Sequence, residues 1–253
     1  VDDLFSTFLY AGNESNRSIN NGIDMTKGGL TWIKERTNDN WNQLFDTERG
    51  VGKRLASNVA NPEMTDATTL SAFNNNGFSI GTNDIINDIG DNYASWTFRK
   101  AKGFCDIVTY TGNATTRTIS HSLGSVPGLI IIKDLTSAHD WVVYHKSMGN
   151  ESFGKLNTTN SFWTGNDIWN STSPTSSNFT IKGNNSFTNT NGNSYVAYVF
   201  AGGNGTTDKA VEFDGTNDYL TVASSSDLTM GTGDFTVECW LTKDAQTHKG
   251  VWH

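Results

Sequence analysis

The sequence of 253 residues is poor in charged side chains, proline and cysteine, and it lacks long hydrophobic runs. Charged residues make up only 17% of the chain and carry a formal net charge of −8, and Lys and Arg form no cluster. A track for nucleic-acid phosphates is therefore not expected. There is also no run of about 18 apolar residues, so the sequence predicts no insertion into a membrane.

The two cysteines and five histidines show no spacing that is typical of a metal site. Cys105 and Cys239 each lie in a strand-like run, and we expect buried free thiols, since a disulfide between them would cross a domain boundary. No nucleophile motif or phosphate-binding loop accompanies His139 and His145, which we expect on the surface or in loops. The sequence therefore predicts no catalytic residue, no metal site and no cofactor, and a protein that is not an enzyme.

What the chain does contain is Gly, Asn, Ser and Thr in abundance, together with eight tryptophans. Turn-forming residues separate short β-branched and aromatic runs about every ten residues, a pattern typical of a sandwich or barrel. We therefore expect an all-β protein. The only helix we expect is short, within residues 47–57 ("TERGVGKRLAS") or 66–73 ("DATTLSAF").

An internal duplication is the clearest feature of the sequence. The stretch "FLYAGNESNRSI", which begins at Phe8, returns as "VTYTGNATTRTI", which begins at Val108. Three further blocks recur in the same order: 28–34 with 127–133, 77–81 with 178–183, and 91–101 with 192–202. The sequence thus predicts two tandem homologous β-sandwich repeats, jelly-roll-like, over residues 1–103 and 104–203.

Four tryptophans lie in or near the repeated blocks. The alignment of "DNWNQLFDTERG" (39–50) with "HDWVVYHKSMG" (139–149) pairs Trp41 with Trp141. Together with Trp32 and Trp96, these side chains fall in strand-like runs. We expect all four in the hydrophobic core.

The turn "FDTERG" brings two carboxylates, Asp46 and Glu48, next to Arg49. A glycosidase uses a pair of carboxylates, so a depolymerase of surface polysaccharide is one hypothesis. The second repeat has "HKSMG" at this place, without any carboxylate. A salt bridge that stabilises the turn is the interpretation we favour.

The loop "NSFWTGNDIWNSTSPTSSN" (160–178) places Trp163 and Trp169 among polar residues without the alternation that buries a strand. Aromatic faces stack on sugar rings, and Asn166 and Asp167 could bond sugar hydroxyls. These four residues are our candidate carbohydrate-binding site. The alternative, which the sequence favours, is that both indole rings fill the edge of the sandwich.

A third pattern begins after the repeats and differs from both. In residues 204–253, "YLTVAS" and "FTVECWL" read as strands on either side of a polar stretch. We interpret this segment as a linker and the first strands of a further, incomplete β-domain. The sequence starts without Met and ends within a strand-like run, so we expect a fragment of a longer polypeptide.

Several of these phrases resemble a known group of proteins. "GGLTWIKERTNDNWNQLFDTERGVGKRLASN", "GDNYASWTFRKAKGF" and "VTYTGNATTRTISHSLGSVPGLIIIK" resemble a repeat of structural proteins in tailed bacteriophages, especially marine and cyanobacterial ones, over about 200 residues. The segment "AVEFDGTNDYLTVASSSDLTMGTGDFTVECWL" is similar to the start of laminin-G-like, concanavalin-like jelly rolls. That second family often binds carbohydrate, sometimes with calcium.

The resemblance implies a virion protein, most readily a tail fibre or another tail appendage that contributes to attachment to host-surface glycans. It also implies contacts with neighbouring virion proteins and a homotrimer, since phage fibres are commonly trimeric. A purely structural role, as a head fibre, a capsid decoration protein or a connector, is the alternative. The depolymerase is the third hypothesis.

Overall fold

The computed structural model describes residues 3–165 and 167–203, which form antiparallel β-sheets almost throughout. Within these ranges the helices are the 3₁₀ helix η1 (Met25–Lys27) and the four-residue α1 (Asp84–Asn87). The all-β prediction is confirmed. No helix in this described part is long and apolar enough to cross a membrane. The predictions for residues 204–253, including Cys239 and the calcium-linked laminin-G resemblance, lie outside the described residues.

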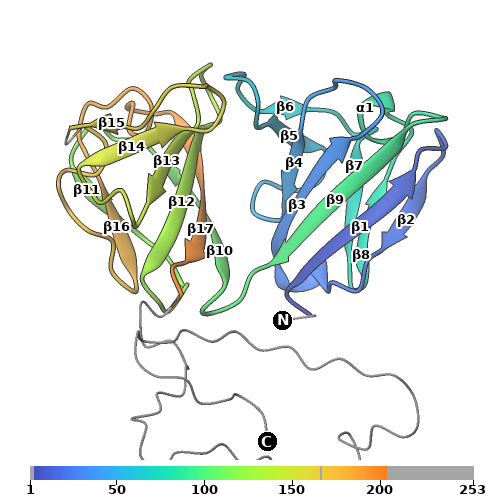
Figure 1. Ribbon diagram of the computed structural model, residues 1–253, viewed down its shortest axis with the longest axis horizontal. Helices are drawn as coiled ribbons and strands as arrows, with labels where there is room; N and C mark the ends of the chain where they lie inside the picture. The colour runs from blue at the N-terminus through green and yellow to red at the C-terminus, as the bar shows by residue number, and fades with distance from the viewer. Residues whose placement is uncertain (1–2, 166, 204–253) are drawn as a thin grey trace, which may run out of the picture. The chain divides into compact units, whose positions relative to one another are not determined.

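The first repeat is a sandwich of two sheets (Figure 1). The large sheet has the order β1 (Phe5–Ala11), β9 (Asn92–Arg99), β3 (Gly29–Glu35), β4 (Gln43–Asp46), β5 (Lys53–Ala56) and β6 (Met64–Thr65). The small sheet has the order β2 (Arg17–Asn20), β8 (Gly77–Ile80) and β7 (Leu70–Asn74). Fully buried side chains such as Ile33, Phe45 and Phe78 fill the space between them.

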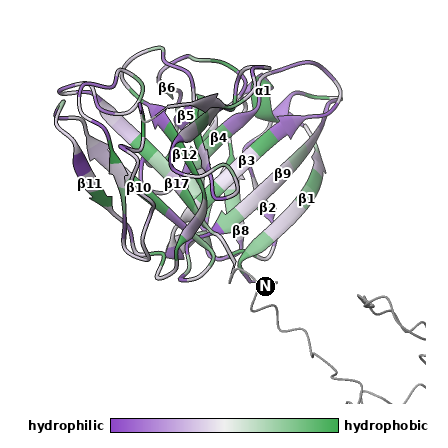
Figure 2. Ribbon diagram, turned by 60° about the vertical axis from the view of Figure 1, so that its left-hand side comes forward, coloured by the Kyte–Doolittle hydropathy of each residue, from purple (hydrophilic) through white to green (hydrophobic). Residues whose placement is uncertain are grey.

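The second repeat has the same strand order in its large sheet. That sheet runs β10 (Cys105–Thr111), β17 (Ser194–Ala201), β12 (Pro127–Asp134), β13 (Val142–His145), β14 (Ser152–Lys155) and β15 (Trp163–Thr164). Its small sheet consists of β11 (Arg117–Ser120) and β16 (Asn178–Ile181). Hydrophobic positions recur within the strands of both large sheets, between hydrophilic and intermediate ones (Figure 2).

The duplicated sequence produces duplicated interactions. Tyr10 and Tyr93 are cross-strand partners with ring centroids 5.1 Å apart and 14° between the ring planes. Tyr110 and Tyr195 occupy the equivalent places with the same distance and angle. Stacked pairs of this kind stabilise the strand pairing at the edge of each large sheet.

The short helix expected from the sequence is wrong in its position. Residues 47–57 contain β5 and residues 66–73 contain most of β7, whereas the α-helix lies at Asp84–Asn87. Gly50 and Gly52 have φ values of +93° and +69°, a backbone conformation that glycine adopts without steric cost. The segment therefore turns twice and enters a strand.

The expected pairing of Trp41 with Trp141 is also wrong, by one residue. The backbone N–H of Asn42 donates to Asn58 Oδ1 at 3.1 Å, and that of Trp141 donates to Asn157 Oδ1 at 3.0 Å. Asn42 is thus the structural counterpart of Trp141. Trp41 lies two residues before β4 begins and is 39% exposed, while Trp141 is fully buried.

A third hydrophobic cluster joins the two repeats into one compact unit. Along β17, Tyr195 and Val199 point into the core of the second repeat, whereas Val196 and Tyr198 point into the shared cluster. The first repeat contributes Leu30, Leu44 and Leu55, with the half-buried Trp32 packed against them. Trp96, the cross-strand partner of Trp32, is half-buried as well.

Equivalent residues of the two repeats meet at this interface. Phe98 and Phe200, counterparts in β9 and β17, lie edge to face with ring centroids 5.4 Å apart. Leu44 and Val143, counterparts in β4 and β13, both belong to the shared cluster. The outer faces of the two large sheets thus pack as two copies of one surface do in a two-fold dimer, here within a single chain.

Cys105 is a buried free cysteine, which confirms the sequence interpretation. Its side chain is 1% exposed at the start of β10. Burial raises the pKa of the thiol to about 12, and a thiol in that state is unreactive near neutral pH.

Candidate functional site

Trp163 is the one candidate tryptophan that the structure places on the surface. It belongs to β15, a two-residue strand at the end of the large sheet, and pairs with Phe153 of β14. The two rings are stacked at 5.5 Å with 17° between their planes. Because Phe153 is buried and Trp163 is 36% exposed, the indole is held by the sheet and still meets solvent.

Lys155 is the second element of this surface. It lies two residues after Phe153 in β14, and its Nζ is 4.8 Å from the ring centroids of both Trp163 and Phe187. Cation–π contacts of this geometry are attractive. Lys155 Nζ is also 2.7 Å from Asp140 Oδ2, which fixes the ammonium group beside the indole.

A shallow pocket of about 330 Å³ adjoins the stacked pair. Phe153 and Phe187 form apolar parts of its wall, and Asn184 supplies an amide group, whereas the amide of Asn185 is engaged in hydrogen bonds within the chain. Aromatic rings beside an amide group are a combination that can hold the apolar face and the hydroxyls of a sugar. We call Trp163, Phe153, Lys155 and Phe187 the Trp163 surface.

The other residues of the candidate carbohydrate site lie in different surroundings. Asp167 lines the pocket with an exposed carboxylate, 3.7 Å from Lys182 Nζ, and its carbonyl accepts a hydrogen bond from Asn185 Nδ2 at 3.0 Å. Asn166 lies outside the described residues.

Trp169 is not a surface residue, so its assignment to the carbohydrate site is corrected. Its side chain is 1% exposed, its Nε1–H donates to the carbonyl of Ser152 at 3.0 Å, and Tyr144 meets it edge to face at 5.5 Å. Both ring faces are therefore covered. For this residue the alternative interpretation, that the indole fills the sandwich, is correct.

The sequence interpretation missed Phe153, Lys155 and Phe187. The phrase "SFGK" places Phe153 and Lys155 two residues apart, so a strand there would have directed both side chains to one face. Their contact with Trp163 depends on the register of a strand of only two residues, for which the sequence carries no pattern.

The turn with the two carboxylates has the expected salt bridge. Arg49 Nε donates to Asp46 Oδ2 at 2.5 Å, and the backbone N–H groups of Glu48 and Arg49 donate to Asp46 Oδ1. Tyr198 of the second repeat donates to Asp46 Oδ2 at 2.8 Å. Because Asp46 is fully buried and both its carboxylate oxygens accept hydrogen bonds from neighbouring residues, it is poorly placed to meet a substrate.

The histidines at the described positions do not gather into a site. His139 Nδ1 lies 3.0 Å from Asp134 Oδ2 in a loop, and His145 is exposed at the end of β13. Among the described residues no group of three or more His, Cys, Asp or Glu side chains could hold a metal ion.

The sequence matches the model of one protein family, described as a domain of unknown function (DUF7483), over residues 2–218. The chain belongs to the DUF7483 family. The comparisons with curated proteins and with solved structures gave no match. The DUF7483 match contains both sandwiches and every residue of the Trp163 surface.

Proposed function

We propose that this DUF7483 chain is a structural component of a tailed-bacteriophage virion, in a tail fibre or another tail appendage, and that it contributes to attachment to host-surface glycans. The resemblance of about 200 residues to phage repeats supports the location. The observation that carries the glycan contact is Trp163, an indole that is 36% exposed and stacked on Phe153.

The fold suits weak binding that is repeated many times. The shared cluster joins both repeats into one compact unit, which keeps the Trp163 surface fixed on a rigid frame. A homotrimer, with several appendages on each virion, would present many copies. Multivalency then raises the overall avidity without a strong single site. The chain would act without catalysis, together with neighbouring virion proteins.

The test is binding of the purified chain to an array of bacterial surface glycans, with Trp163→Ala as the variant and Trp41→Ala as the control. Trp41 is 39% exposed and lies in the other repeat. We expect Trp163→Ala to weaken binding about tenfold, the value of one stacking contact, and Trp41→Ala to bind like the wild type. Equal binding by all three proteins would contradict the proposed glycan contact.

A purely structural role is the second candidate, and the interface between the repeats favours it. The packing of the two large sheets and the buried Asp46–Arg49–Tyr198 group make a stiff module without any ligand. A head fibre, a capsid decoration protein or a connector needs such stiffness. Failure of every glycan to bind the wild-type chain would favour this role.

A further inference from the structure

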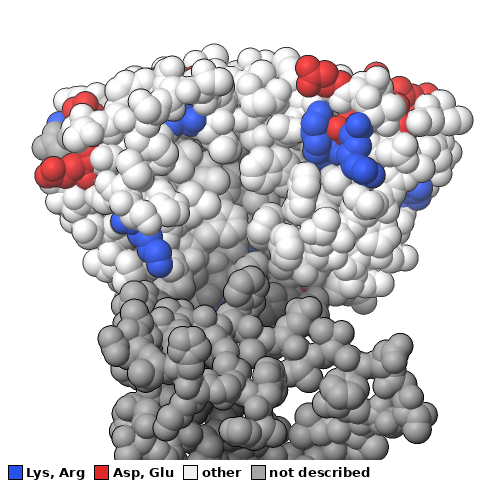
Figure 3. Space-filling model, in the orientation of Figure 1, with Lys and Arg blue, Asp and Glu red and all other residues white. Residues whose placement is uncertain are grey.

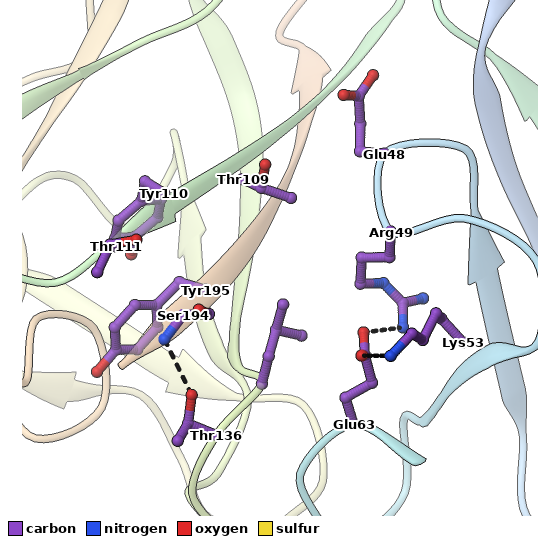
Figure 4. A pocket seen from close by; sticks show the side chains of 11 residues that line it. Glu48, Arg49, Lys53, Glu63, Thr109, Tyr110, Thr111, Thr136, Ser194 and Tyr195 are labelled. Carbon is purple, nitrogen blue, oxygen red and sulfur yellow. Dashed lines mark hydrogen bonds and ion pairs between the residues drawn. The ribbon is translucent and has the colours of Figure 1, made fainter. Parts of the chain in front are cut away.

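A polar cleft of about 550 Å³ lies between the two repeats, away from the Trp163 surface. Its volume is within the range of small-molecule sites. Figure 4 shows charged residues of the first repeat on one side and hydroxyl-bearing residues of the second on the other. The first set is Glu48, Arg49, Lys53 and Glu63, and the second includes Thr109, Thr111, Thr136 and Ser194.

The cleft forms where the two large sheets diverge. Ile107 of β10 is buried in the shared cluster. Thr109 and Thr111 follow on the same face of this end strand, and both are exposed. Along this face of β10, Ile107 thus packs against the other repeat, whereas Thr109 and Thr111 line the cleft.

The hydroxyl wall has unused hydrogen-bonding capacity. The side chains of Thr109, Thr111 and Ser194 make no hydrogen bond within the described part of the chain, and each hydroxyl can donate once and accept twice. Thr136 Oγ1 accepts only the backbone N–H of Ser194, at 3.0 Å. The wall can therefore bond a ligand without giving up an internal contact.

The charged wall is already neutralised. Glu63 is 3.0 Å from Lys53 Nζ and 3.4 Å from Arg49 Nη1, and Glu48 is 2.6 Å from Lys100 Nζ. The two acids and two bases that line the cleft sum to zero charge. An ionic ligand would have to displace one of these partners, whereas a neutral hydroxyl group can share them through charge-assisted hydrogen bonds. The face shown in Figure 3 also carries charges only in small, separate groups.

The fold does not require these hydroxyls. In the first repeat the counterparts of Thr109, Thr111 and Ser194 are Leu9, Ala11 and Asn92, as the matching registers of β1 and β10 show. Two of these three positions are thus apolar in the first repeat. Thr136 does have a counterpart, since Thr37 Oγ1 accepts the backbone N–H of Asn92 at 2.9 Å, but the hydroxyls of Thr109, Thr111 and Ser194 belong to the second repeat alone.

We infer that this cleft binds an uncharged oligosaccharide, whose hydroxyls bond Thr109, Thr111 and Ser194 on one side and Glu48 and Lys53 on the other. The inference rests on the proposed function, because it adds a second glycan site to the same chain. The two sites differ in chemistry, since one offers an aromatic platform and the other a polar slot.

The test is an NMR titration of the full 253-residue chain with neutral hexasaccharides of glucose, mannose and N-acetylglucosamine, and with a sulfated hexasaccharide. We expect a neutral probe to shift the backbone amides of Thr109, Thr111 and Ser194 in a saturable way. The variant Thr109→Leu/Thr111→Ala, which carries the residues of the first repeat, should weaken that binding about tenfold for two lost hydrogen bonds. Thr118→Ala, on the exposed face of β11, is the matched control.

The outcomes separate the cleft from the proposed function. Two outcomes would overturn the cleft inference and leave glycan attachment intact. In the first, a probe shifts the resonances of Trp163 but none in the cleft. In the second, only the sulfated probe shifts the cleft resonances. If no probe shifts resonances at either site and no surface glycan on the array binds, both the cleft inference and the proposed function would be overturned. Cleft shifts that persist in Trp163→Ala but weaken in the double variant would support a separate site.

Discussion

Tyr198 of the second repeat donates a hydrogen bond to Asp46 of the first, with 2.8 Å between the hydroxyl oxygen and Oδ2. Both side chains are buried, and Asp46 also pairs with Arg49. The turn of one repeat is therefore completed by a hydroxyl of the other. This contact makes the two sandwiches interdependent at a polar point as well as through their shared hydrophobic cluster.

Removal of that hydroxyl should destabilise the whole unit. Tyr198→Phe leaves a buried carboxylate with one hydrogen bond fewer, and we expect a loss of about 1–3 kcal/mol in the free energy of unfolding, measured with urea. The control is Tyr144→Phe, since Tyr144 is buried and its hydroxyl makes no hydrogen bond within the described chain. Equal losses in the two variants would show that the contact with Asp46 contributes nothing.

The two tryptophans of the 160–178 loop should differ sharply in their effect on stability. Trp169→Ala removes a buried ring and the hydrogen bond to Ser152, so we expect a loss of about 3–5 kcal/mol. Trp163→Ala removes a partly exposed ring, and its cost should stay below about 1 kcal/mol. Urea unfolding of both variants checks this order, which a similar loss in each would refute.

Lys133 should give the protein a distinctive pH dependence. Its Nζ is buried and donates to the carbonyls of Ala60, Asp134 and His139, and burial lowers its pKa from 10.5 to about 8, although Asp134 and Asp140 oppose that shift. Between pH 8 and pH 10.5, Lys133 binds more protons in the unfolded chain than in the folded one. The contribution of Lys133 to the free energy of unfolding therefore rises with pH in this window.

The measurement compares urea unfolding of the wild type and Lys133→Met from pH 7 to pH 10. The comparison with the variant cancels the titration of the tyrosines. The stability difference should move in favour of the wild type above pH 8, by at most about 1.4 kcal/mol per pH unit. Parallel curves for the two proteins would contradict the lowered pKa.

Replacing Asp91 by Asn, the residue at the equivalent position of the second repeat, should stabilise the protein. Burial and the neighbouring Glu35 raise the pKa of Asp91, whereas its counterpart Asn193 donates to Asp134 Oδ2 at 2.8 Å. A raised pKa in the folded state costs stability as the pH rises through that pKa and costs nothing below the pKa of the unfolded chain. Asp91→Asn should therefore raise the free energy of unfolding at pH 7 and lose this advantage toward pH 3. A destabilised variant at pH 7 would refute the account.

Sequence patterns predicted the repeated architecture and several local features of its strands and turns. The duplication, the all-β architecture, the burial of Cys105 and the Asp46–Arg49 bridge all follow from short-range patterns in strands and turns. The exposure of Trp41 was missed because the alignment paired it with the buried Trp141, whose structural counterpart is Asn42.

The candidate site was only partly predictable. Trp163 and Trp169 stand in similar polar surroundings in the sequence, and only tertiary packing separates them: one pairs across a strand of two residues, and the other closes the core beside Tyr144. The hydroxyl wall was not visible either, because it depends on how the second repeat packs against Lys53 and Glu63 of the first.

The most direct test of the proposed function is a density map of the intact virion in which this chain is located. We expect the two sandwiches on a thin tail appendage, with the Trp163 surface facing away from the particle. Density for the chain on the capsid or within the tail hub would contradict a role in host attachment.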